Sequence, residues 1–407
     1  MSVSTIDFTR RNIAIDILRA LTMLLMIFVN DLWTIRDYPN WLGHAERGQD
    51  MLGLADVVFP CFLFVVGMSI PFAIERRFSK GMSGVSTVGH ILSRTLALLL
   101  MGAFIVNTEY GVSPDTGMSL GMFRILMVIA FLLIWNVYPK TDNENKKRLY
   151  STLKIVGVLL LVYLAIVFRD SEGGIFSARW WGILGAIGWT YLFCAFTYLF
   201  TRDRFRYLVP IWLILILICI LKSKTMSGES SLNLPRGNFL DEWLNMLHLG
   251  NGALPAFTIG GILLSLVSTK YAQTSNPTKA ICLAGAVCIL LIAGFLSHNV
   301  WIVAKLGSTP PWVFFCLAIA IGMYGIIYWL VEMGKASWFD IIKPAGTATL
   351  TCYLIPYVTY SLAAITGIKL PEWLTIGYAG IINCILYSFI IIGITWLLGK
   401  VHIKLKI

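Results

Sequence analysis

The stretch from Asn30 to Ala73 reads NDLWTIRDYPNWLGHAERGQDMLGLADVVFPCFLFVVGMSIPFA, and it decides both the fold class and the candidate chemistry. The chain leaves one apolar segment at Asn30, crosses a short polar loop that contains His44, and enters a second apolar segment that contains Asp56. A histidine in a loop between two membrane spans, with a carboxylate at the start of the next span, predicts acid–base chemistry at a membrane face.

The composition places the whole chain in a bilayer. Of its 407 residues, 57% are hydrophobic and 13% are charged, whereas about a quarter of the residues of a soluble domain are charged. Apolar runs of about 20 residues recur, which is the length of a membrane-spanning helix. We therefore predict an all-α polytopic membrane protein of about 11–12 transmembrane helices, with one integral-membrane domain over residues 1–407. Because Met1–Asn12 is polar and the first apolar run is already span-length, we expect no removable signal peptide.

The apolar runs also predict a topology. The predicted spans lie near 13–34, 52–75, 89–107, 117–136, 150–168, 178–200, 207–222, 247–267, 277–296, 309–332, 345–365 and 375–398. With the N-terminus inside, the predicted loops on that side carry about twice as many Lys and Arg residues as the opposite loops, which favours cytoplasmic termini. The same bias accounts for the net charge of +11, so nucleic-acid binding has no support.

A polar layer is predicted near the cytoplasmic face. Asp16 and Arg19 are three residues apart and share a helical face in the first span, and Arg94 enters the third span from the same side. Their surplus positive charge suits an anionic ligand that arrives from the cytoplasm. The alternative is a structural Asp16–Arg19 ion pair, with Arg94 extended towards lipid headgroups.

A second polar layer is predicted near the outer face. It consists of Asn30 and Asp31 at the end of the first span, His44 in the loop, Asp56 at the start of the second span and Arg124 in the fourth. A carboxylate beside an imidazole orients the ring and raises its basicity, as a general base requires. The alternatives are that His44 is a solvated loop residue and that Asp56 only caps its helix.

Two other features carry less information. All 8 cysteines lie inside apolar runs without metal-ligand spacing, so we expect neither a metal site nor a disulfide framework. The segment Lys305-Leu-Gly-Ser-Thr-Pro-Pro311 reads as an outer turn into the predicted span 309–332, and mere solvation is one interpretation of Lys305.

Several motifs resemble those of the heparan-alpha-glucosaminide N-acetyltransferase family. The specific ones lie in the N-terminal part of the chain: Asp16-Ile-Leu-Arg19, Met26-Ile-Phe-Val-Asn30, His44-Ala45, Ala55-Asp56-Val-Val-Phe-Pro60 and Gly67-Met-Ser-Ile70. The segments Thr309-Pro-Pro-Trp312 and Lys343-Pro-Ala-Gly346 are similar as well, but they are weaker matches. Two departures concern the spacing from His44 to Asp56, which is slightly longer here, and Gly346-Thr-Ala, which lacks the family's asparagine.

The resemblance implies a function. Family members move acetyl from cytoplasmic acetyl-CoA to the amine of a terminal glucosamine across the membrane, and their active-site histidine corresponds to His44. The bacterial branch implies a plasma (bacterial inner) membrane protein, and the family implies a homodimer. Since the large lumenal domain of the lysosomal member has no counterpart in this sequence, we expect the acceptor to be a monosaccharide or a short amino sugar.

These observations combine into one hypothesis. His44 is predicted to act as the base, Asp56 or Asp31 to orient it, and Asn30 to donate a hydrogen bond to the oxyanion. The residues predicted to bind acetyl-CoA are Asp16, Arg19, Arg76, Arg94 and Arg124, with Arg77 beside them. The expected partners are a small amino sugar and membrane lipid, with no metal and no nucleic acid. The rival hypotheses are a sugar transporter or permease and an O-acyltransferase of an envelope glycan.

Overall fold

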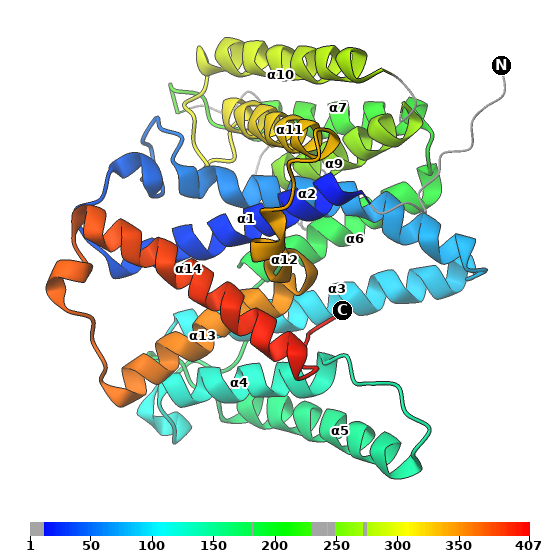
Figure 1. Cartoon of the computed structure of the whole chain (residues 1–407). Coiled ribbons are helices and arrows are strands. Elements are labelled where there is room, and N and C mark those ends of the chain that lie inside the picture. Colours follow the sequence, from blue (N-terminus) through cyan, green and yellow to red (C-terminus); the bar gives the residue numbers. More distant parts are fainter. Residues whose placement is uncertain (1–11, 181, 229–241, 243–248, 272–274) are drawn as a thin grey trace. The chain divides into compact units, whose positions relative to one another are not determined.

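The described part of the chain is helical. The computed structural model describes residues 12–180, 182–228, 242, 249–271 and 275–407. Within these residues, 11 helices are long and apolar enough to cross a membrane, and the shorter apolar helix α4 (Leu120–Trp135) adds to them. Figure 1 shows these helices and no strand in the described ranges. The predicted all-α polytopic class is confirmed.

The chain divides into two compact units. The described residues of the first unit fall within 12–22, 39–95 and 189–339, and those of the second within 23–38, 96–188 and 340–407. Four of the described helices contribute residues to both units: α1 (Ile13–Asp31), α3 (Gly84–Glu109), α6 (Ile183–Thr201) and, by its first residue alone, α12 (Phe339–Thr347). The single domain over 1–407 stays a prediction, since each unit draws on separate parts of the sequence.

Helix α2 (Leu54–Ser79) packs closely against α9 (Ala253–Lys270) in the first unit. Gly67 lies directly against the backbone of Thr258, where an added Cβ would overlap the Thr258 carbonyl oxygen, and Gly261 lies equally close to the Phe64 carbonyl. Small residues that let two helix backbones approach in this way are typical of membrane helix packing. Among its described residues, this unit also contains α7 (Phe205–Lys222), α10 (Asn276–His298) and α11 (Pro310–Glu332), with the short η2 (Asn40–Leu42).

The second unit is built around α4, which packs against α5 (Glu144–Val167) and α13 (Thr349–Thr366). Its remaining elements are α12 (Phe339–Thr347, from Asp340 onward), α14 (Gly377–Lys400), η1 (Leu32–Thr34), η3 (Pro114–Thr116) and η4 (Glu372–Leu374). Helix α5 begins earlier than the predicted 150, because the Asn143 side chain accepts hydrogen bonds from the Asn145 and Lys146 amides and caps the helix. The predicted span 247–267 begins at Ala253, and residues 247 and 248 lie outside the described ranges.

Candidate functional site

The loop that carries His44 is closed at its base by two glycines. Gly43 and Gly53 approach so closely that a Cβ on Gly53 would overlap the Gly43 carbonyl oxygen. Only glycine fits at such a backbone contact. The contact fixes the two ends of the loop, which holds His44 over the first turn of α2.

Asp56 occupies that first turn, and its carboxylate organises the loop. Its Oδ2 accepts hydrogen bonds from the amides of Ala45 (2.9 Å) and Gly53 (3.4 Å), so the side chain caps α2 as the sequence alternative proposed. Its Oδ1 lies 2.7 Å from His44 Nδ1. The Asp56 side chain is 2% exposed, whereas that of His44 is 54% exposed. The carboxylate therefore performs both predicted roles: it caps the helix and it binds the histidine.

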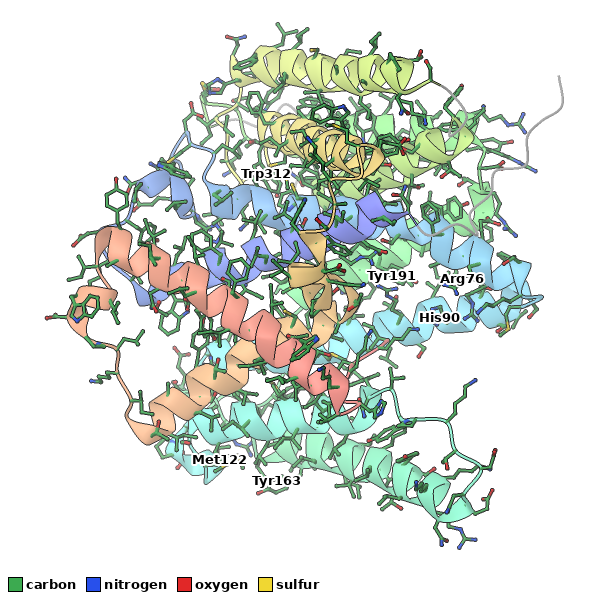
Figure 2. The ribbon with its side chains drawn as sticks, in the orientation of Figure 1. Arg76, His90, Met122, Tyr163, Tyr191 and Trp312 are labelled. Atoms are coloured by element: carbon green, nitrogen blue, oxygen red, sulfur yellow. The ribbon has the colours of Figure 1, made fainter. Side chains whose placement is uncertain are left out.

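The backbone of Asp56 is held from a third element. Trp312 of α11, labelled in Figure 2, donates its indole Nε1–H to the Asp56 carbonyl oxygen at 3.0 Å. Trp312 itself is 1% exposed. A buried tryptophan that donates its hydrogen bond is rigid, so the pair is anchored to α11 as well as to α2.

This geometry determines the tautomer of His44. The contact of Nδ1 with Asp56 Oδ1, at 2.7 Å, is shorter than its contact with Lys305 Nζ, at 3.3 Å. An ionised carboxylate can only accept hydrogen bonds, so we assign the proton to Nδ1, which then donates a hydrogen bond to Asp56. No hydrogen bond from a described residue engages the other ring nitrogen, Nε2. The lone pair of Nε2 on a half-exposed ring is free to accept a proton from an incoming molecule, which is the arrangement of a general base.

Lys305 is a third member of the site that the sequence did not predict. It lies between α10 and α11, and its Nζ is 3.3 Å from His44 Nδ1 and 3.8 Å from Asp56 Oδ1. Its side chain is 26% exposed, so the interpretation of Lys305 as merely solvated is wrong. Burial lowers the pKa of the Lys305 ammonium group, although the Asp56 carboxylate acts in the opposite direction.

A second histidine–carboxylate contact ties the His44 loop to the segment that carries Lys305. Asp50 Oδ2 lies 2.7 Å from His298 Nε2, and its Oδ1 accepts the Val303 amide at 2.8 Å. The Met51 amide donates in turn to the Val303 carbonyl. Partial burial raises the pKa of Asp50, but the hydrogen bonds from Val303 and His298 outweigh it and lower the pKa overall. The Lys305 segment is thus fixed beside the loop.

A cluster of basic residues lies where α2 ends and α3 begins. Arg77 donates to the Ser86 carbonyl at 3.0 Å, and the Arg94 guanidinium lies 4.7 Å from the ring centroid of Tyr191. Arg77 Nε and Arg94 Nε are buried, and neither has a hydrogen-bond partner among the described residues. Buried cationic donors without partners are suited to an anion such as phosphate.

The other predicted residues of this unit have different surroundings. Arg76, labelled in Figure 2, is exposed and lies near the end of α2. Two residues later, the Phe78 carbonyl accepts a hydrogen bond from the Gly81 amide, where the helix ends. Arg19 forms the predicted ion pair with Asp16 at 3.1 Å and also donates to Ser69 Oγ at 2.6 Å. Arg19 is therefore engaged by protein groups, as the structural alternative proposed, and Arg94 and Arg77 are the better candidates for an anion.

The predicted outer layer falls into both units. His44 and Asp56 belong to the first unit, while Asn30, Asp31 and Arg124 belong to the second. Buried Asp31 accepts a hydrogen bond from the Tyr360 hydroxyl at 2.6 Å, so of the two carboxylates proposed to orient His44, the structure provides the contact for Asp56.

The second unit contains a cavity of its own. Its volume is ≈ 540 Å³, and its lining includes Asn30, Arg124, Glu109 and Tyr353. Arg124 Nε donates to Thr108 Oγ1 at 3.2 Å. The cavity is mostly apolar with a few convergent polar groups, which is the usual character of a small-molecule site. The roles predicted for Asn30 and Arg124 stay predictions. Among the described residues, no group of three or more His, Cys, Asp or Glu side chains is arranged to hold a metal ion.

The fold and the site together define a polytopic membrane protein. It has a histidine–carboxylate pair at the start of α2, and two arginines with buried Nε atoms, one near the end of α2 and one in α3. The family model described as "Domain of unknown function (DUF5009)" matches residues 11–234. That range is more than half of the chain and includes His44, Asp56, Arg77 and Arg94. The chain belongs to this family, and its motifs make it heparan-alpha-glucosaminide N-acetyltransferase-like.

Two curated relatives carry that name. The mouse heparan-alpha-glucosaminide N-acetyltransferase is 33% identical over 115 residues, which cover 26% of this chain and 16% of the mouse protein. The human heparan-alpha-glucosaminide N-acetyltransferase is 31% identical over 105 residues, which cover 25% of this chain and 14% of the human protein. The similarity thus spans less than a fifth of either relative.

Proposed function

We propose that this chain is a membrane acetyltransferase that transfers acetyl from acetyl-CoA to the amine of glucosamine or a related amino sugar. The observation that carries the proposal is the 2.7 Å contact between His44 Nδ1 and the buried Asp56 carboxylate, which leaves Nε2 free. The names of the two relatives support the reaction class and suggest the acceptor.

The chemistry assigned to His44 follows from its tautomer. An amine attacks a thioester as its nitrogen loses a proton, and His44 Nε2 accepts that proton while the new C–N bond forms. Asp56 stabilises the imidazolium that results, because its carboxylate is already hydrogen-bonded to Nδ1. His44 then returns the proton to the sulfur that leaves as the C–S bond breaks, so protons balance over one cycle.

The donor side of the proposal rests on the basic cluster. Acetyl-CoA supplies the acetyl group as a thioester and carries phosphates. The unpartnered Nε groups of Arg77 and Arg94 fit those phosphates and would hold them. Asp56 and Arg77 lie near opposite ends of α2. Their separation in sequence corresponds to roughly 30 Å of helix, about the thickness of the hydrocarbon core.

That separation supports transfer across the membrane. Helix α2 carries Asp56, the partner of the proposed base, at one end and Arg77, one of the proposed phosphate ligands, at the other. Such an arrangement is expected when donor and acceptor occupy different aqueous compartments. We propose the orientation that the charge bias predicts, with both termini and Arg77 cytoplasmic and His44 on the outer side.

The test is the release of CoA thiol by purified protein given acetyl-CoA and glucosamine. We expect glucosamine-dependent release that His44→Ala loses while it still binds acetyl-CoA. His402→Asn is the matched control, since His402 is exposed and remote in sequence from the site, and asparagine tolerates its positive φ of 61°. We expect this control to release CoA at the wild-type rate.

Three outcomes would contradict the proposal in different ways. Turnover retained by His44→Ala would remove His44 from the mechanism. Equal release with N-acetylglucosamine would indicate an O-acyltransferase, because that sugar offers only hydroxyl groups. Saturable sugar uptake into proteoliposomes, without CoA release for any amino sugar, would indicate a transporter.

A further inference from the structure

Lys305 makes contacts that neither the family match nor the sequence motif explains. The family model ends at residue 234, so Lys305 lies outside it. Yet its ammonium nitrogen lies 3.3 Å from His44 Nδ1 and 3.8 Å from Asp56 Oδ1, across 261 residues of sequence from His44. A long side chain that is mostly buried, with its charge directed at an acid–base pair, affects the charge of that pair.

We propose that Lys305 is a positioning residue whose ammonium group keeps His44 in the uncharged form that can accept a proton. The proposal rests on the proposed function of His44 as a base. Lys305 does not touch the reacting atoms in this account, because it lies on the Nδ1 side of the ring while the proton is accepted at Nε2.

The charges of Lys305 and His44 both act on the Asp56 carboxylate. With His44 neutral, the Asp56 carboxylate and the Lys305 ammonium cancel. Protonation of His44 then places two positive charges beside one carboxylate whose side chain is 2% exposed, which is unfavourable. Without the ammonium, the carboxylate and the imidazolium cancel instead, and the protonated form of His44 becomes the favoured one. An imidazolium has no lone pair with which to act as a base.

Of the described groups that surround His44, Lys305 is the cation close enough to its ring to affect its charge. From α2 the ring meets Asp56, and from the segment after α10 it meets Lys305. Helix α11 presents Trp312 and Cys316, which are uncharged and contact the Asp56 carbonyl. On the loop itself, Glu46, Arg47 and Asp50 are exposed, and Asp50 is bound to His298 and Val303.

The segment that carries Lys305 is rigid enough to hold this geometry. The Ala304 amide donates to Thr309 Oγ1, and the Ser308 amide donates back to the Lys305 carbonyl at 2.9 Å. Asn251 Nδ2 donates to the Ser308 carbonyl at 2.7 Å and anchors the turn to the residues before α9. These bonds fix the backbone from which Lys305 extends. They therefore help to hold its side chain beside His44 and Asp56.

The test measures the charge state of His44 without any acetyl transfer. Diethylpyrocarbonate modifies only the uncharged imidazole, and peptide mass spectrometry reports the modified fraction of His44 and of His298 at each pH. We expect Lys305→Met to raise the midpoint of His44 modification by about 1 pH unit or more. Lys305→Arg, which keeps the positive charge, and Lys369→Met, which removes an exposed lysine elsewhere, should leave the midpoint where it is.

An unchanged His44 midpoint in Lys305→Met would overturn the proposal. Modification of His298 serves as the internal control for folding, because this ring contacts Asp50 and not Lys305. If Lys305→Met does not fold, Lys305→Gln replaces it with a polar uncharged side chain, and the same shift is expected. Absence of CoA release by the wild-type protein would overturn the proposed function but would leave the His44 shift in place, so the two failures are distinguishable.

Discussion

Replacement of Asp56 by asparagine tests whether the Asp56 carboxylate keeps the His44 proton on Nδ1. Asparagine keeps the shape of the side chain, and its amide oxygen can take the place of Oδ2, which accepts the Ala45 and Gly53 amides at 2.9 and 3.4 Å. Its NH₂ group then faces His44 Nδ1 from the position where Oδ1 lies at 2.7 Å. An NH₂ group only donates, so Nδ1 must accept and the ring proton moves to Nε2. His44 then has no lone pair directed at the substrate.

The expected magnitude follows from the wrong tautomer. In a comparable histidine–aspartate pair this change lowers kcat by about 10⁴-fold, so we expect a loss of about 10³–10⁴-fold, equivalent to roughly 4–5.5 kcal/mol of activation free energy. The thermal unfolding temperature should change little, because the backbone bonds of the helix cap are kept. Asp56→Ala, by contrast, leaves the two amides without acceptors at a cost of about 1–3 kcal/mol each.

The assay compares initial rates of CoA release with thermal unfolding in the same detergent. A kcat for Asp56→Asn within tenfold of the wild type, with an unchanged unfolding temperature, would refute the argument that Asp56 sets the tautomer of His44. If Asp56→Asn lowers kcat and also lowers the unfolding temperature substantially, the substitution acts through folding instead.

Two further predictions concern the donor site and the helix packing. Arg94→Ala should raise the KM for acetyl-CoA by about tenfold, with little change in kcat. This is the effect expected from the loss of one charge-assisted hydrogen bond of about 1.4 kcal/mol. An unchanged KM would mean that the role of Arg94 is structural. Gly67→Ala should lower the thermal unfolding temperature, because the new Cβ overlaps the Thr258 carbonyl, whereas Gly89→Ala has open space and should not; equal unfolding temperatures would contradict the α2–α9 contact.

The sequence was sufficient for the helices and for the contact between His44 and Asp56. Apolar runs of span length predict membrane helices because the bilayer leaves the backbone no other way to satisfy its hydrogen bonds. His44 and Asp56 are only 12 residues apart, so a short loop is enough to bring them near each other, and the contacts of Trp312 and Asp50 then hold the loop and the pair in place. Local patterns of this kind are readable from sequence alone.

The rest of the site depends on tertiary packing. Lys305 reaches His44 across 261 residues, and a lysine in a polar turn carries no local sign of such a contact. Tyr191 likewise meets Arg94 from a different helix. The one available signal was the Thr309-Pro-Pro-Trp312 motif, which begins four residues after Lys305 and supplies the Trp312 hydrogen bond to Asp56.

The arginines predicted to bind acetyl-CoA have different surroundings in the structure. Arg19 and Asp16 were correctly predicted to share a face, but their ion pair and the bond to Ser69 occupy the guanidinium. Arg77 stood beside Arg76 in sequence, and only the structure shows that Arg77 is the partly buried member with an unpartnered Nε.

The most direct test of the central claim is acetyl transfer across a sealed membrane. The protein is reconstituted into proteoliposomes of known orientation, with isotopically labelled acetyl-CoA on the side of the termini and glucosamine on the other. Transfer across the membrane with His44 as the base predicts labelled N-acetylglucosamine only in the glucosamine compartment, and none with His44→Ala. Product that forms only when donor and acceptor share one compartment would contradict it.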